Sequence, residues 1–98
     1  MKNPYRAIRR DGFPSIKHSH RAKKLKSLEK QGVISNLEFE KPFKLIVNDV
    51  LICRYYADFC YTYNGKDIVE DVKGMVSPVY LLKKKLMLGC LGIAIREV

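Results

Sequence analysis

The sequence has no apolar run long enough to cross a membrane, and no signal-peptide pattern follows Met1. We therefore expect a cytoplasmic protein without a membrane partner. Its cysteines are few, odd in number and without CxxC spacing: Cys53, Cys60 and Cys90. This pattern argues against a disulfide framework and against a zinc site, and it is typical of free thiols in a reducing compartment.

Acidic residues are also scarce, with 10 Asp and Glu against 19 Lys and Arg, which gives a formal net charge of +9. Such a charge indicates a polyanionic partner, of which nucleic acid is the favoured class. The alternative is a solvated basic surface, or an electrostatic binder of the ribosomal kind. No repeat or linker divides the 98 residues, so we expect a basic N-terminal arm at 1–14 and a single domain at 15–98.

The first helix is expected to begin after Ser15 as its N-cap and to run to about Gln31, where Gly32 provides a left-handed stop. Apolar side chains recur in it at spacings of three and four. His18 lies on or beside this inward stripe, while His20 falls nearly opposite, among the lysines.

Strand-like runs follow this helix, separated by the hairpin signals Asn48-Asp49 and Asn64-Gly65. Ser77-Pro78 then opens a second helix at about 78–89, which is expected to bury Val79, Leu82 and Leu86. The fold class is therefore α/β or α+β, with two helices around a small mixed sheet. The expected strand-like runs are 34–42, 43–47, 51–63, 67–74 and 93–98.

Acidic residues within these strands form the candidate site. Alternation puts Asp71 and Lys73 on one face and Glu70 on the other. Asp58 lies about as far before the Asn64-Gly65 turn as Asp71 lies after it, so pairing brings the two carboxylates close together. They repel unless a cation lies between them, and such oxygen ligands suit Mg²⁺ or Mn²⁺. The alternative is a solvent-facing cross-strand pair of Asp and Lys.

Several stretches, in order, resemble the PD-(D/E)XK nuclease superfamily. They are "LEKQGVISNLEFEKPFKLI", "YYADF", "IVEDVKG", "SPVYLLKKKLM" and "IREV". The stretch from Phe13 to Val98 is similar to small phage and prophage proteins placed in that superfamily. This resemblance implies a restriction-endonuclease-like αβββαβ core, and a DNA endonuclease that works in the cytoplasm of a bacterial host.

The resemblance also implies roles for individual residues. Asp58 and Asp71 would bind Mg²⁺ or Mn²⁺ together with the carbonyl of Val72, and Lys73 would position the attacking water. Glu70 is set aside as a ligand because of its face, although a slip of the register would bring it in. The substrate would be duplex or branched DNA, such as a Holliday junction, cut by a homodimer. The residues expected to hold phosphates are Arg9, Arg10, Lys17, Arg21, Lys24, Lys83, Lys84 and Lys85.

His18 departs from the family pattern, because similar members carry a glutamate in a Ser-x-x-Glu context at this position. It is counted among the candidate catalytic residues, as a replacement ligand or a proton carrier. Two other readings stay open: a structural histidine bonded to a carboxylate, or a weakened site. The corresponding alternative functions are a DNA-binding accessory protein without catalytic activity and a protein that binds and inhibits a host nuclease.

Overall fold

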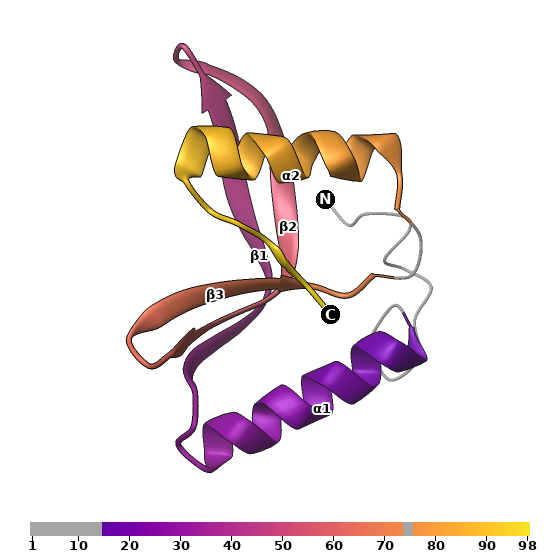
Figure 1. Cartoon of the computed structure of the whole chain (residues 1–98), viewed down its shortest axis with the longest axis vertical. Coiled ribbons are helices and arrows are strands. Elements are labelled where there is room, and N and C mark those ends of the chain that lie inside the picture. Colours follow the sequence, from indigo (N-terminus) through magenta and orange to yellow (C-terminus); the bar gives the residue numbers. More distant parts are fainter. Residues whose placement is uncertain (1–14, 74–75) are drawn as a thin grey trace.

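The computed structural model describes residues 15–73 and 76–98 (Figure 1). The expected basic arm at 1–14, with Arg9 and Arg10, lies outside the described residues. The fold is mixed α+β, as the sequence predicts, and the described residues form two helices and four strands, one strand fewer than the five expected runs. The elements, in order, are α1 (Ile16–Lys30), β1 (Ser35–Val47), β2 (Val50–Tyr63), β3 (Lys66–Asp71), α2 (Pro78–Leu91) and β4 (Arg96–Glu97).

The predicted caps and turns are confirmed. The Ser15 hydroxyl accepts a hydrogen bond from the amide of His18, and Gly32 has a φ of 80° just beyond α1. Both hairpin turns have two successive residues with positive φ, as a type I′ turn requires. Asn and Gly tolerate this conformation better than most residues, which is why they are found there. The turn residues are Asn48, Asp49, Asn64 and Gly65.

The four strands form one sheet in the order β1-β2-β3-β4, in which β4 pairs parallel to β3 and the other pairs are antiparallel. The runs 34–42 and 43–47 are one continuous strand, β1, with Pro42 inside it. An edge strand tolerates a residue without an amide hydrogen. The closing strand is only Arg96–Glu97, shorter than predicted, because Ile93 and Ile95 pack into the core.

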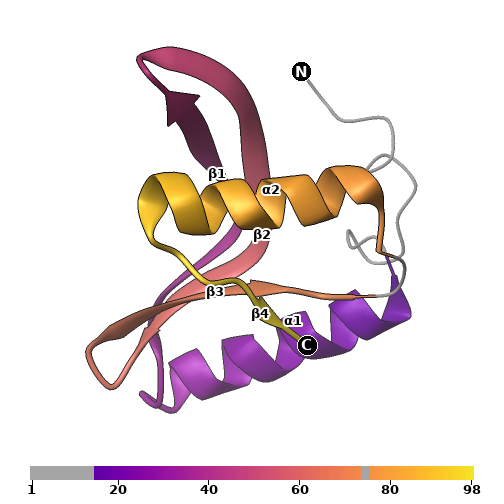
Figure 2. The same cartoon turned by 45° about the horizontal axis from the view of Figure 1, so that its top comes forward.

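Two apolar clusters lie on the two faces of the sheet, and β2 and β3 run between α1 and α2 (Figure 2). Alternation near the end of β2 sends Phe59 and Tyr61 to one cluster and Cys60, between them, to the other. The α1-side cluster contains Ala22, Leu25, Ile34, Phe59 and Tyr61. The α2-side cluster contains Leu45, Tyr55, Ala57, Cys60, Val69, Met87 and Ile95.

The inward face of α2 differs from the prediction. Val79 and Leu82 were expected to be buried, but they are 60% and 57% exposed. Met87 is fully buried instead, and Tyr80 packs with Leu86 against the α2-side cluster. The Tyr80 hydroxyl donates to Glu97 of β4 at 2.7 Å, which fixes the rotation of the helix. Apolar residues occur all around α2, so their spacing alone did not identify the buried stripe.

No helix within the described ranges is long and apolar enough to cross a membrane.

Candidate functional site

The hairpin of β2 and β3 brings Asp58 and Asp71 together. The register pairs Phe59 with Glu70, so the next step along the ladder reaches Asp58 and Asp71. The two side chains therefore start from adjoining backbone positions on paired strands, and the negative charge of Asp58 acts on Asp71. Both residues are buried, at 6% exposure each. The site is therefore a pair of adjoining carboxyl groups under the surface of a basic protein.

Asp71 is held by two donors. The Tyr55 hydroxyl donates to its Oδ1 at 2.9 Å, and the Lys73 ammonium forms an ion pair with its Oδ2. Burial and the negative charge of Asp58 raise the pKa of Asp71 above its ordinary value, although Lys73 and Tyr55 act in the opposite direction. Burial and Asp58 therefore act against the charged form of Asp71, which Lys73 and Tyr55 support.

Asp58 shows the opposite shift. Burial by itself would raise its pKa, but hydrogen bonding with His18 and with the Val72 amide outweighs burial and lowers it. The Val72 amide donates to Oδ2 at 2.8 Å, and His18 Nε2 lies 3.4 Å from Oδ1. Asp58 is thus the member of the pair that keeps its negative charge.

His18 lies between α1 and the sheet and is only 3% exposed. Its ring centroid is 4.7 Å from that of Phe59, while its Nε2 faces Asp58. The predicted position on the inward stripe is therefore correct. This geometry favours the reading in which the histidine orients a carboxylate.

The carboxylate pair fits a hard divalent cation better than a soft one. Mg²⁺ in proteins is commonly bound through one or two carboxylates and keeps several of its waters. Asp58 and Asp71 provide such a pair, and Val72 adjoins it through its amide. Within 15–73 and 76–98, no group of three or more His, Cys, Asp and Glu side chains is arranged around a common point. Asp58 and Asp71 by themselves would leave most coordination positions of a cation to water.

Glu70 faces away from this pair, as alternation predicts, but it has a structural role that the sequence analysis missed. Its side chain is fully buried on the α1 side. Arg21 binds it with two hydrogen bonds, Nε to Oε1 at 2.9 Å and Nη2 to Oε2 at 2.6 Å, and Tyr61 donates its hydroxyl to the same carboxylate. Arg21, expected to hold phosphate, is thus a partner of Glu70 and ties α1 to β3.

The lysines that were expected to hold phosphate differ in their surroundings. Lys17 donates to the carbonyl of Lys73 at 2.9 Å, and it lines a pocket of about 240 Å³ with His20, Arg21 and Lys24. Lys83 lines a pocket of about 260 Å³ that also contains Asp71 and Lys73. Lys84 instead forms an ion pair with Glu97 at 2.9 Å, and Lys85 is exposed. Lys17 and Lys83 are therefore the cations best placed to meet a phosphate near the carboxylates.

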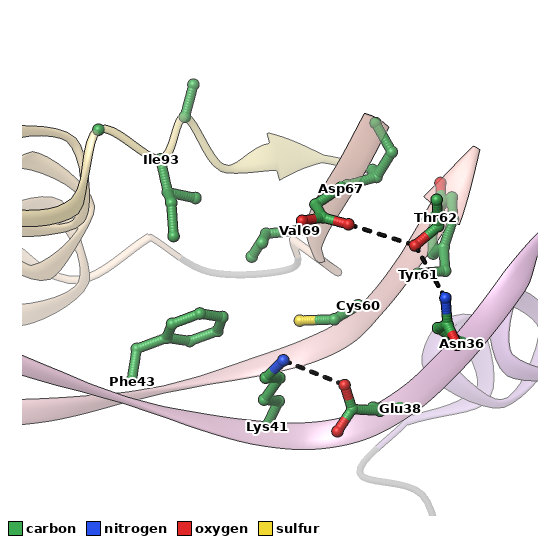
Figure 3. A pocket seen from close by; sticks show the side chains of 13 residues that line it. Asn36, Glu38, Lys41, Phe43, Cys60, Tyr61, Thr62, Asp67, Val69 and Ile93 are labelled. Atoms are coloured by element: carbon green, nitrogen blue, oxygen red, sulfur yellow. Dashed lines mark hydrogen bonds and ion pairs between the residues drawn. The ribbon is translucent and has the colours of Figure 1, made fainter. Parts of the chain in front are cut away.

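Figure 3 shows a larger pocket of about 490 Å³, which none of the predicted site residues lines. Its polar side chains already bind one another, because Lys41 pairs with Glu38, and Thr62 bonds both Asn36 and Asp67. Burial raises the pKa of the Cys60 thiol in its wall to about 11, so this thiol is a poor nucleophile at neutral pH. We therefore place the candidate site at Asp58 and Asp71.

Comparison with known sequences and structures adds one finding. Neither the curated proteins nor the solved structures include a match to this chain. A protein-family model matches residues 5–89, which is most of the sequence. The chain therefore belongs to the family described as "Protein of unknown function (DUF1064)".

Proposed function

We propose that this protein is a metal-dependent endonuclease that hydrolyses phosphodiester bonds in DNA. The observation that carries the proposal is that two buried carboxyl groups, Asp58 and Asp71, lie one step beyond the paired residues Phe59 and Glu70, with a lysine bound to Asp71. A bound Mg²⁺ or Mn²⁺ would neutralise charge on the phosphate and lower the pKa of water. The formal charge of +9 supports a polyanionic substrate.

The residues around the carboxylates have distinct tasks in this proposal. Asp58 and Asp71 hold the cation, and Tyr55 fixes the orientation of the Asp71 carboxylate by its hydrogen bond. The Lys73 ammonium lies beside Asp71, from where it orients the attacking water and stabilises negative charge on the phosphate oxygens. Val72 and His18 hold Asp58 in place through contacts with its two oxygens.

The PD-(D/E)XK resemblance supports the same proposal. The observed order of elements is αβββαβ, and the third strand ends at Asp71, with Val72 and Lys73 directly after it. We propose that the fold is a small restriction-endonuclease-like core in which His18 takes the place of a glutamate. We also retain the homodimer as a proposal. Its support is the exposed apolar side chains of the β1–β2 hairpin and of α2, among them Val50, Ile52, Leu82 and Leu88.

The direct test is cleavage by the purified protein. Supercoiled plasmid and synthetic four-way junctions are incubated with Mg²⁺, with Mn²⁺ and with EDTA. We expect cleavage with either metal and none with EDTA. If the protein cuts no nucleic acid with any divalent metal, the enzyme proposal is wrong. Salt-sensitive DNA binding without cleavage would then favour the second candidate, a DNA-binding accessory protein, which the basic composition also supports.

Metal binding is expected to stabilise the fold, because a cation between Asp58 and Asp71 removes their repulsion. At a free metal concentration of about 100 times the Kd, linkage gives roughly 2.7 kcal/mol, or about 10–20 °C in Tm for a chain of this size. Differential scanning fluorimetry with Mg²⁺, Mn²⁺ and EDTA measures the shift. In EDTA, Asp71→Asn should remain folded, because the amide keeps the shape of the side chain and still accepts from Tyr55. The variant should lose the metal-induced shift.

The pH dependence of this stability has opposite signs for the two acids. The raised pKa of Asp71 favours folding at low pH, and that contribution is lost as the pH rises through its folded pKa. The lowered pKa of Asp58 favours folding above its unfolded pKa, and that contribution is lost as the pH falls through its folded value. The Tm gained from metal should therefore grow from acidic to neutral pH. A metal-induced shift that is independent of pH would contradict the assignment of the cation to these two carboxyl groups.

A further inference from the structure

The part of the β1–β2 hairpin nearer its turn has one covered face and one open face. Tyr55 and Ala57 are buried in the α2-side cluster, and Cys53 packs against it. Alternation therefore places the residues between them on the opposite face. The α1-side cluster covers that side of the sheet elsewhere, but among the described residues it includes none from 42 to 57. Figure 1 shows why, because this part of the hairpin runs past α2 and away from α1.

The open face carries two basic side chains directly opposite each other. The register pairs Lys44 with Arg54, and the next pair on the same face is Pro42 with Tyr56. All four residues are exposed. Directly opposite residues have Cβ atoms about 4.5–5.5 Å apart, so the two cations start from neighbouring points. We call these four residues the Lys44–Arg54 face.

No acid balances the two charges on this face. The nearest acids along the two strands, Glu40 and Asp58, are four residues away, or about 13 Å. Neither Lys44 nor Arg54 forms an ion pair with an acid of 15–73 or 76–98. Like charges directly opposite each other destabilise a sheet. The pair is therefore unfavourable for the fold alone and becomes favourable when one polyanion binds both groups.

A polyanion fits this face better than a second copy of the chain does. In a symmetric dimer a surface patch meets itself, so Lys44 and Arg54 would face the same two cations again. DNA instead presents one negative charge per about 1.7 Å of its axis. The homodimer proposed above uses apolar side chains nearer the turn and on α2, which leaves the Lys44–Arg54 face free for another partner.

The face is also within reach of the candidate site. His18 contacts Asp58 from the α1 side of the sheet, which is the side of the open face. Arg54 precedes Asp58 by four residues, and its Cα is at most about 14 Å from that of Asp58. DNA covers this distance in about four base pairs, at about 3.4 Å each. A duplex with one phosphate at the carboxylates can thus bring a neighbouring phosphate to Lys44 and Arg54.

We propose that the Lys44–Arg54 face binds the backbone phosphates of the DNA beside the cleavage site, without reading its sequence. This inference rests on the proposed function and deepens it by naming where the flank of the substrate lies. The Tyr56 hydroxyl on the same face is a further donor of the kind that binds phosphate oxygens. Lys44 and Arg54 are positioning residues, because they hold the substrate at a distance from the reacting phosphate.

The test compares Lys44→Gln/Arg54→Gln with the wild type by fluorescence anisotropy of a labelled duplex, in EDTA and over a series of salt concentrations. The slope of log K against log salt should fall in magnitude by about 1.8, since each lost phosphate contact contributes about 0.9. Binding at about 0.1 M salt should weaken by about 10- to 60-fold. Each single variant should lose about half of the slope change.

Lys30→Gln/Lys66→Gln is the matched control. It removes the same charge from exposed lysines at the end of α1 and at the start of β3, where Lys66 pairs with Tyr63 at the far end of β2 from Arg54. The control should keep the wild-type slope. Equal slopes for the two double variants would overturn the proposal, because the effect would then follow net charge and not this face.

Cleavage kinetics and sedimentation give independent readouts. Lys44→Gln/Arg54→Gln should raise KM and keep kcat at saturating DNA, since it removes binding that is the same in the ground and transition states. A fall in kcat at unchanged KM would contradict the proposal. Without DNA, the variant should sediment as the wild type does, and a changed sedimentation coefficient would assign the face to self-association instead. It should melt no lower than the wild type, because a repulsive pair is removed.

The failure of this inference is distinguishable from failure of the proposed function. If the wild type cleaves with metal while both double variants bind and cleave alike, the enzyme stands and the Lys44–Arg54 face falls. If the wild type cleaves nothing but the salt slope still falls only in Lys44→Gln/Arg54→Gln, the face stands and the endonuclease proposal falls. A wild type that binds no DNA overturns both.

Discussion

Asp71→Asn is expected to reduce metal-dependent DNA cleavage by about 10³-fold or more, the scale on which removal of a single catalytic group acts. The amide keeps the shape of the side chain and still accepts from Tyr55, so the packing around it is preserved. What is lost is one of the two negative charges that hold the cation. Initial rates on plasmid at saturating Mg²⁺ or Mn²⁺ measure the effect.

Lys73→Met tests the same site by removing the ammonium group that binds Asp71. Loss of a positive charge that stabilises the transferring phosphate typically costs about 10²–10³-fold in rate. The cation should still bind, so the metal-induced rise in Tm should persist in this variant and be absent from Asp71→Asn. This difference separates a group that binds metal from one that acts on the substrate.

Asp67→Asn serves as the matched control for the acid. It lies on the same strand, β3, but its carboxylate accepts from Thr62 at the far end of the hairpin. We expect its cleavage rate to equal that of the wild type. If Asp71→Asn cleaves as fast as Asp67→Asn, Asp71 does not bind the catalytic metal and the assignment fails.

Arg21→Ala is expected to be the most destabilising single change among the charged residues discussed above. It leaves the Glu70 carboxylate fully buried with only the Tyr61 hydroxyl to compensate its charge. Breaking a buried ion pair in this way costs about 3–5 kcal/mol. For a chain of this length that is roughly 12–40 °C in Tm. Urea unfolding followed by circular dichroism measures the loss.

The double variant Arg21→Met/Glu70→Leu should recover most of that stability. It removes both charges, and the two apolar side chains fill the space against the α1-side cluster. The exposed Lys23→Ala on the same helix is the control, with an expected change within about 0.5 kcal/mol. If Arg21→Ala alone is as stable as this control, the ion pair of Arg21 with Glu70 does not stabilise the packing of α1 against the sheet. The activity of the double variant then reports whether α1 still presents His18 to Asp58.

Local sequence patterns were sufficient for the helix starts and the turns. Ser15 and Ser77 mark both helix starts, because their hydroxyls accept from amides that lack an intrahelical partner. The pairs at 48–49 and 64–65 mark both turns. The contact of Arg21 with Glu70 was not anticipated, because a basic residue on a lysine-rich helix gives no indication that it faces a buried acid.

The register that places Asp58 and Asp71 at adjoining positions was also predictable, because hairpin pairing depends only on the number of residues on each side of the turn. The orientation of α2 was not, since apolar residues surround that helix and the choice among them depends on Tyr80 and its bond to Glu97. The pairing of Arg21 with Glu70 depends on how α1 docks on the sheet. No local pattern contains that information.

The sequence by itself determined the helices, the turns, the strand alternation and the meeting of two acids in a strongly basic chain. Each of these follows from interactions between residues close in the chain, or from counting along a hairpin. Only the tertiary structure decided the rest: which face of α2 is buried, that Glu70 is a buried anchor for α1, and that the Tyr55 hydroxyl binds Asp71. These depend on how separate elements dock, where the shape and charge of distant side chains select one arrangement among several that the local sequence permits.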